Sequence, residues 1–135
     1  MTLPRLFLDA MEEYDRAQEA RYDLAMALPR LRAKRDEERA VVAALEAQEM
    51  LNGGSGRNAE LRTAWIKRAL ADSTPYQQAL ARLRESDIAI SENEAAQEDL
   101  SNTMRACRLR VEFLTSANYR EAAAEGGREF RRLSE

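Results

Sequence analysis

A group of basic residues surrounds the only tryptophan of the chain, in a short stretch between two predicted helix breaks. The candidate residues for binding nucleic acid or a protein partner are Arg57, Asn58, Arg62, Trp65, Lys67 and Arg68. Arginine and lysine contact phosphates, and an exposed indole offers a surface on which bases stack. The pattern therefore predicts a small binding surface for nucleic acid. The alternative is that Trp65 packs into the junction between helices while the cations stay solvated, because single tryptophans usually anchor cores.

Catalytic chemistry has little support in this sequence. The chain has no His and one Cys, Cys107, which removes the usual zinc and transition-metal ligand sets and the usual general base. We therefore predict no enzymatic activity, no cofactor, no metal site and no small-molecule substrate. Arginines at 105, 108 and 110 could lower the pKa of Cys107. However, its place on an apolar helical stripe favours a core thiol over a reactive one.

Acidic clusters and a glycine-rich stretch each allow a second interpretation. Carboxylates near Glu38 and Glu94 could hold Mg²⁺ in a helical hydrolase, but they alternate with arginines at helical spacing, which is typical of a solvated helix face. The stretch Gly53-Gly54-Ser55-Gly56 precedes a helix, as a phosphate-binding loop does. It lacks the preceding strand and the Lys-Ser/Thr pair of such loops, which favours a flexible connection.

Composition points to an all-α protein. One third of the residues are charged (33%), with only five Gly and three Pro, a profile typical of long helices and coiled coils. We expect one elongated helical domain over residues 1–135 that forms a homo-oligomer. The net charge of −3 argues against a protein that coats nucleic acid without sequence preference. No signal peptide or membrane-spanning run is evident, so we expect a cytoplasmic protein with no membrane partner.

The apolar pattern and the Gly and Pro positions predict a long antiparallel helical hairpin, a coiled coil with a short helix at its tip. Pro29 falls inside the first helix, where it predicts a kink or a short break. Thr74 to Gln77 read as a capping box that starts the last helix, and Gly126-Gly127 should end it. The expected elements are a long helix over 4–51, a loop over 52–58, a short helix over 59–71 capped by Asn58, a long helix over 74–125 and a frayed terminus over 126–135.

An antiparallel hairpin fixes which residues face one another. Residues whose numbers add to about 125 should lie opposite, which places Tyr14 against Val111. The polar middle of one helix then meets that of the other, and a phase slip is expected between residues 91 and 99. There Arg35 and Glu38 would pair with Asp87 or Glu94, or else face an opening within an oligomer.

The residues around the short helix resemble an element of small phage and prophage coiled-coil proteins. The matching residues are Leu51-Asn52-Gly53, then Arg57-Asn58-Ala59-Glu60-Leu61-Arg62, and then Tyr76-Gln77-Gln78-Ala79-Leu80. Those proteins carry Asn-Gly-Lys-Asn-Ala-Glu-x-Arg between two long helices. This chain differs by inserting Gly54-Ser55-Gly56 and by having Arg57 in place of Lys. The resemblance covers about residues 50–83 and implies a non-catalytic accessory protein of phage recombination or replication, in the host cytoplasm.

Residues and resemblance together predict a helical accessory protein that presents its short helix to DNA or to a DNA-processing protein. The rival is a structural or adaptor coiled coil, such as a virion-assembly, scaffolding or host-factor-binding protein, with no affinity for DNA. Such a protein would bind helices of its partner along the polar middle of the hairpin.

Overall fold

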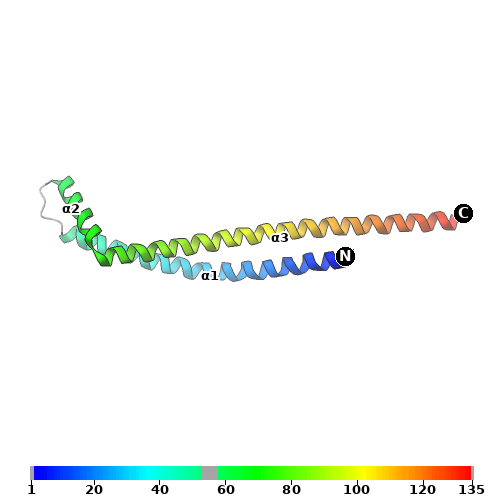
Figure 1. Ribbon diagram of the computed structural model, residues 1–135, viewed down its shortest axis with the longest axis horizontal. Helices are drawn as coiled ribbons and strands as arrows, with labels where there is room; N and C mark the ends of the chain where they lie inside the picture. Colours follow the sequence, from blue (N-terminus) through cyan, green and yellow to red (C-terminus); the bar gives the residue numbers. More distant parts are fainter. Residues whose placement is uncertain (1, 53–57, 135) are drawn as a thin grey trace. The chain divides into compact units, whose positions relative to one another are not determined.

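The computed structural model describes residues 2–52 and 58–134, with side chains as far as Gly127, and every element in these ranges is an α-helix (Figure 1). The helices are α1 (Leu3–Asn52), α2 (Ala59–Asp72) and α3 (Thr74–Ser134). Their bounds agree with the predicted ones within one residue, except at the end of α3. Positions 53–57 of the predicted loop lie outside the described residues.

The chain divides into two compact units, each of which contains part of α1 and part of α3. Unit 1 comprises Met1–Ala25 and Ala95–Glu135, and unit 2 comprises Met26–Glu94. Side chains pair across the helices at Glu46–Tyr76, Glu38–Arg82 and Arg32–Glu94 in unit 2, and at Glu13–Arg110 in unit 1. The residue numbers in these pairs add to between 120 and 126. The helices are therefore antiparallel within each unit, and the predicted register is confirmed to within about a turn.

Side chains that are buried or half-buried recur along α3 in alternating steps of three and four residues. We call this line of positions the α3 seam, and it comprises Tyr76, Ala79, Leu83, Ser86, Ile90, Asn93, Gln97, Leu100, Met104, Cys107, Val111 and Leu114. The steps continue unbroken through residues 91–99, so the predicted phase slip is wrong. Asn93 and Gln97 occupy seam positions, and a search for apolar residues alone does not recognise them.

The core between α1 and the α3 seam within each unit is thin. Among the described residues, the buried apolar side chains are Ala10, Ala17, Val42, Ala79, Ile90, Met104, Cys107 and Leu114. Half of these are Ala or Cys, whose side chains remove little apolar surface from water. Fourteen large apolar side chains in the same ranges remain exposed. Intramolecular packing thus leaves much apolar surface available for association.

The predicted break at Pro29 and the predicted helix end at Gly126-Gly127 are wrong, while the alternative of a kink at Pro29 stays a prediction. Helix α1 continues through Pro29, which is exposed, while its neighbours Leu28 and Leu31 are half-buried. Because Pro29 faces solvent, the carbonyl one turn before it can turn toward water, and flanking contacts keep the helix continuous. Helix α3 likewise passes through Gly126 and Gly127 to Ser134, and neither glycine has a positive φ. Glycine weakens a helix by about 1 kcal/mol without forcing it to end.

The polar middle of unit 2 pairs differently from the prediction. Glu38 forms an ion pair with Arg82 at 3.5 Å, and Glu94 forms one with Arg32 at 3.6 Å. Arg35 reaches the adjacent Asp36 at 3.5 Å instead of the facing helix. The prediction failed because the pairing depends on side-chain rotamers and not only on register.

Candidate nucleic-acid interface on the short helix

Helix α2 is held at both ends by hydrogen bonds. At its start, Asn58 Oδ1 accepts from the Glu60 amide at 2.9 Å, which confirms the predicted cap. At its end, the Ser73 amide donates to the Leu70 carbonyl at 3.2 Å. Ser73 has an extended backbone (φ −82, ψ 111), and this one residue joins α2 to α3.

Ser73 also caps the start of α3, in place of the predicted Thr74. Its Oγ accepts from the Tyr76 amide at 3.4 Å, and its carbonyl accepts from the Gln77 amide at 3.0 Å. The Gln77 side-chain amide donates back to the Leu70 carbonyl at 3.3 Å. Pro75 is therefore the second helical residue, where its missing amide proton costs no hydrogen bond.

The phenol of Tyr76 connects the start of α3 to the end of α1. It donates to Glu46 Oε1 at 2.8 Å. This hydrogen bond, followed by burial and the charge of Glu46, raises the pKa of Tyr76 above its usual 10.0. The base of α2 is thus fixed to both long helices of unit 2.

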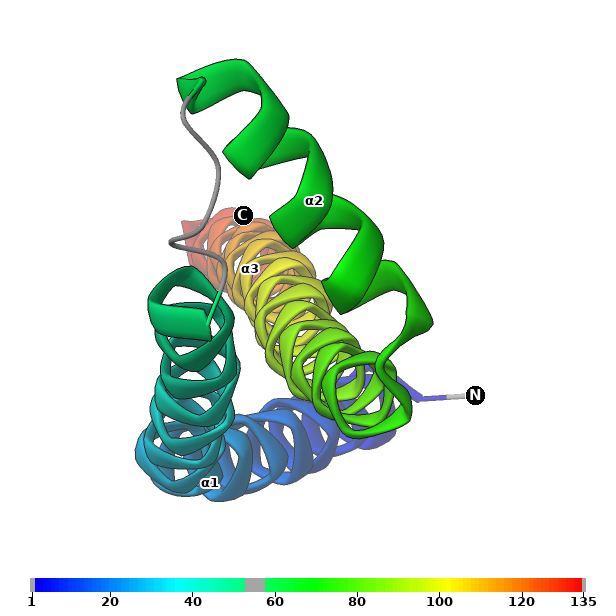
Figure 2. The ribbon, with the colours of Figure 1, turned by 90° about the vertical axis from the view of Figure 1, so that its left-hand side faces the viewer.

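Away from this base, α2 is exposed along most of its length. None of its residues is buried, and Ile66, Ala69 and Leu70 are its half-buried positions. Figure 2 shows α2 rising from the start of α3 and diverging from the long helices. Trp65 is 49% exposed, so it does not serve as the core anchor that the alternative interpretation required.

The candidate cations lie on two different sides of α2. Arg62 and Arg68 stand three residues before and after Trp65, which places each about 60° from it around the helix. Leu61, 66% exposed, adds an apolar side chain to the same face. Lys67 lies nearly opposite and borders a shallow hollow with Glu60 and Thr63. We call Leu61, Arg62, Trp65 and Arg68 the Trp65 face.

The remaining two predicted site residues contribute differently. Asn58 uses its side-chain oxygen as the helix cap, so its role is structural. Arg57 lies outside the described residues.

The cations of α2 have no carboxylate partners within the described part of the chain. Arg32, Arg82 and Arg110 each pair with a carboxylate of the facing helix. By contrast, no described carboxylate lies within 4.0 Å of Arg62, Lys67 or Arg68. These three charges therefore remain available to an anionic ligand, because binding would not require an existing ion pair to break.

The other chemistry considered from sequence finds little support. Cys107 is fully buried, and burial raises the pKa of its thiol, with Glu13 adding to the rise and Arg110 opposing it. Within the ranges described, no three His, Cys, Asp or Glu side chains are grouped as a metal site would require. The described helices also contain no stretch with the length and hydropathy of a transmembrane span.

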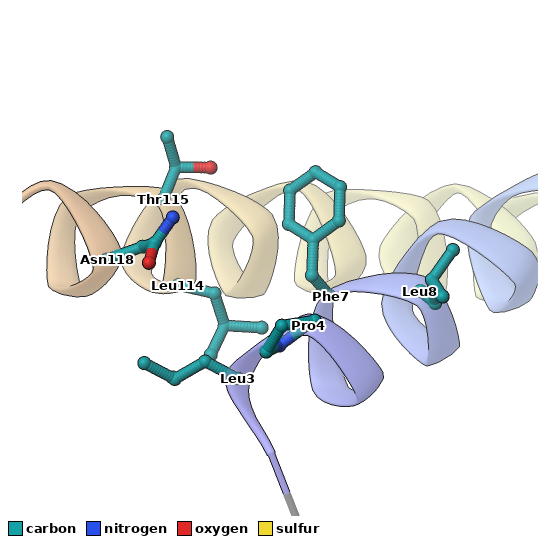
Figure 3. A pocket seen from close by; sticks show the side chains of 7 residues that line it. All are labelled: Leu3, Pro4, Phe7, Leu8, Leu114, Thr115 and Asn118. Carbon is teal, nitrogen blue, oxygen red and sulfur yellow. The ribbon is translucent and has the colours of Figure 1, made fainter.

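Sequence inspection missed an apolar groove in unit 1, which we call the terminal groove. It has a volume of about 410 Å³ and is lined by Leu3, Pro4, Phe7, Leu8, Leu114, Thr115 and Asn118. Figure 3 shows the α1 residues beside those of α3. A second hollow of about 330 Å³ is lined further along by Met11, Tyr14, Asp15, Cys107, Arg108, Val111 and Glu112. The sequence feature that could have indicated this groove is an apolar stripe at the start of α1, formed by Pro4, Phe7, Leu8 and Met11.

Comparison of the chain with protein-family models, with curated proteins and with solved structures gives no match.

Proposed function

We propose that this chain is a non-catalytic accessory protein that binds single-stranded DNA through the Trp65 face of α2. The observation that carries the proposal is a half-exposed indole with an arginine on each side, neither of which is paired with a described carboxylate. An indole stacks on any base, while the guanidinium groups contact the flanking phosphates. The resemblance of residues 50–83 to phage coiled-coil proteins supports a role in phage recombination or replication.

The size of the Trp65 face limits the affinity that we expect. Two arginine–phosphate contacts on single-stranded DNA give a slope of about −1.4 in a plot of log K against log salt concentration. Stacking on one tryptophan adds about 1–3 kcal/mol. The net charge of −3 opposes binding at long range. The affinity should therefore be in the micromolar range and weaken modestly with salt.

Trp65 is itself the reporter for the test, because it is the only tryptophan. Titration with an unlabelled oligonucleotide should quench its fluorescence, and anisotropy of a labelled oligonucleotide gives the affinity. Arg62→Gln and Lys67→Gln remove the same charge from opposite sides of α2, so they are a matched pair. Arg62→Gln should weaken binding at least threefold more than Lys67→Gln. DNA binding without quenching, or with equal effects of the two variants, would remove the Trp65 face from the proposal.

A protein-binding scaffold is the second candidate function. The fourteen exposed large apolar side chains favour it, since Leu61 and Trp65 could also receive an apolar helix. In that case oligonucleotides would cause no quenching at low salt, and association with the partner would be insensitive to salt. The absence of any DNA binding would therefore favour this function over the first.

The non-enzymatic part of the proposal is supported by the environment of the acidic residues. Glu38 and Glu94, the candidates for a hydrolytic metal site, each pair with an arginine of the facing helix. A coiled-coil interpretation of the helices belongs to the same proposal, and the three–four steps of the α3 seam support it. Calorimetric binding of Mg²⁺ or Mn²⁺ at micromolar affinity would contradict the non-enzymatic part.

A further inference from the structure

In unit 1, α3 continues well beyond the start of α1. Leu3 lines the same groove as Asn118, and Figure 1 shows the end of α3 running past the first turn of α1. Every described side chain from Asn118 to Gly127 is exposed. We call residues 119–134 the α3 tail, and α1 has no residue beside it in the described ranges.

An unpartnered helix of this kind is poorly stable in water. Isolated helices of fewer than about 12–15 residues are marginal even when rich in alanine. The α3 tail, residues 119–134, is only slightly longer than this and contains Gly126 and Gly127, each of which weakens a helix. Its helical form therefore calls for packing against a surface that unit 1 does not supply.

One face of the α3 tail suits close packing. Tyr119, Ala122, Ala123 and Gly126 follow one another at spacings of three, one and three residues, so they share one side of the helix. The described charged residues of the tail, Arg120, Glu121 and Glu125, lie off this side. Small side chains allow two helices to approach closely, and an added Cβ at either glycine would meet nothing within 4 Å in this chain.

The terminal groove and the hollow beside it offer an apolar surface of matching length. Their α1 residues run from Leu3 to Asp15, which is about 18 Å along the helix, and the α3 tail is about 22 Å long. A chain cannot place its own tail there, since α3 is continuous and leads away from the groove. A second copy brings a helix of the required length, with its small-residue face over residues 119–126.

We propose that the protein forms a twofold-symmetric dimer in which the α3 tail of each copy lies in the terminal groove of the other. Each chain contributes one groove and one tail, so the two contacts are identical and the assembly closes at two copies. The contact covers Leu8, 54% exposed, and the adjacent Phe7. This inference is independent of DNA binding by α2.

The test compares the mass of the full chain with that of four single variants by sedimentation equilibrium over a range of concentrations. Leu8→Glu in the groove is matched by Leu109→Glu, which is 60% exposed and lies on the side of α3 away from its seam. Ala123→Glu on the small-residue face of the tail is matched by Ala124→Glu on the other side. All four positions are exposed, so the monomer should keep its fold, which circular dichroism checks.

The wild-type chain should be a dimer whose dissociation constant rises at least tenfold with Leu8→Glu and with Ala123→Glu. The matched variants should raise it less than threefold. A wild-type chain that remains monomeric up to about 100 µM, where contacts weaker than about 5.5 kcal/mol go undetected, would overturn the proposal. The proposal would also be overturned if Leu8→Glu and Ala123→Glu raised the dissociation constant of the dimer no more than their matched variants do.

Discussion

Tyr76, at the start of α3, donates its phenolic proton to the carboxylate of Glu46, near the end of α1, at 2.8 Å. Removal of this hydroxyl in Tyr76→Phe should lower the free energy of unfolding by about 1 kcal/mol at neutral pH, since both residues are only half-buried. The expected loss is measured by urea denaturation.

The same hydrogen bond predicts a pH dependence. The pKa of Tyr76 is raised in the folded state, so its contribution is complete below the unfolded value of 10.0 and is lost as pH rises through the folded pKa. The stability difference between wild type and Tyr76→Phe should therefore shrink above about pH 10. All other residues are the same in the two proteins, so the difference isolates the Tyr76 hydroxyl. A constant difference across this range would contradict the assigned hydrogen bond.

The ion pair between Glu38 and Arg82 should stabilise the fold more than that between Glu13 and Arg110. The Glu38 side chain is 16% exposed, against 43% for Glu13. The Glu13–Arg110 pair is shorter, at 3.1 Å instead of 3.5 Å, but this changes the Coulomb energy by only about a tenth. Partial burial changes the effective dielectric constant by a larger factor.

Double-mutant cycles to alanine measure both couplings. We expect about 1 kcal/mol for Glu38–Arg82 and at most about 0.5 kcal/mol for Glu13–Arg110. A larger coupling energy for Glu13–Arg110 than for Glu38–Arg82 would mean that distance outweighs burial in these ion pairs.

Ser86 and Asn93 are buried polar residues seven positions apart on the α3 seam, and their replacement should have opposite effects. Within the described residues, the Ser86 hydroxyl has no hydrogen-bond partner, whereas Asn93 has an interaction partner. Ser86→Ala should therefore be neutral or stabilise by up to about 1 kcal/mol. Asn93→Ala should destabilise by about 1–3 kcal/mol, because it removes the interaction of a buried polar group and leaves a cavity. Thermal unfolding of the two variants tests the contrast.

Gly126 and Gly127 weaken the α3 tail without providing a turn. An added Cβ at either position has open space around it, and neither φ is positive. At concentrations where the chain is monomeric, the double variant Gly126→Ala/Gly127→Ala should therefore increase the helical signal in circular dichroism and favour the helix by up to about 1 kcal/mol per site. A loss of helical signal would show that one of these positions needs glycine.

Local signals made the helix boundaries predictable. The cap at Asn58 and the start of α3 follow from short polar residues before apolar runs, although Ser73 took the role assigned to Thr74 one position later. The antiparallel register followed from the single turn region. The end of α3 was not predictable from local signals, because glycine permits a helix to continue as well as to stop. Whether the helix continues depends on the residues beyond the glycine.

Features that depend on how the helices pack together were harder to predict from the sequence. Amphipathic spacing put Trp65 on one face of α2 but could not show that this face remains exposed, since exposure depends on how Ser73 orients the helix. Polar seam residues such as Asn93 are invisible to an apolar pattern. The terminal groove was missed because the predicted apolar pattern of the first helix began at Tyr14, so Phe7 and Leu8 were left out of it.

The one-residue connection at Ser73 fixes the orientation of α2 relative to the start of α3. One extended residue separates two helices whose ends share hydrogen bonds through Ser73 and Gln77. Rotation of α3 about its own axis must therefore swing α2 with it, and a register change of one residue along the seam corresponds to a turn of about 100°. The direction in which the Trp65 side chain faces is thus set by how the first turns of α3 pack against α1. A change in the rotation of α3 about its axis would therefore move the indole.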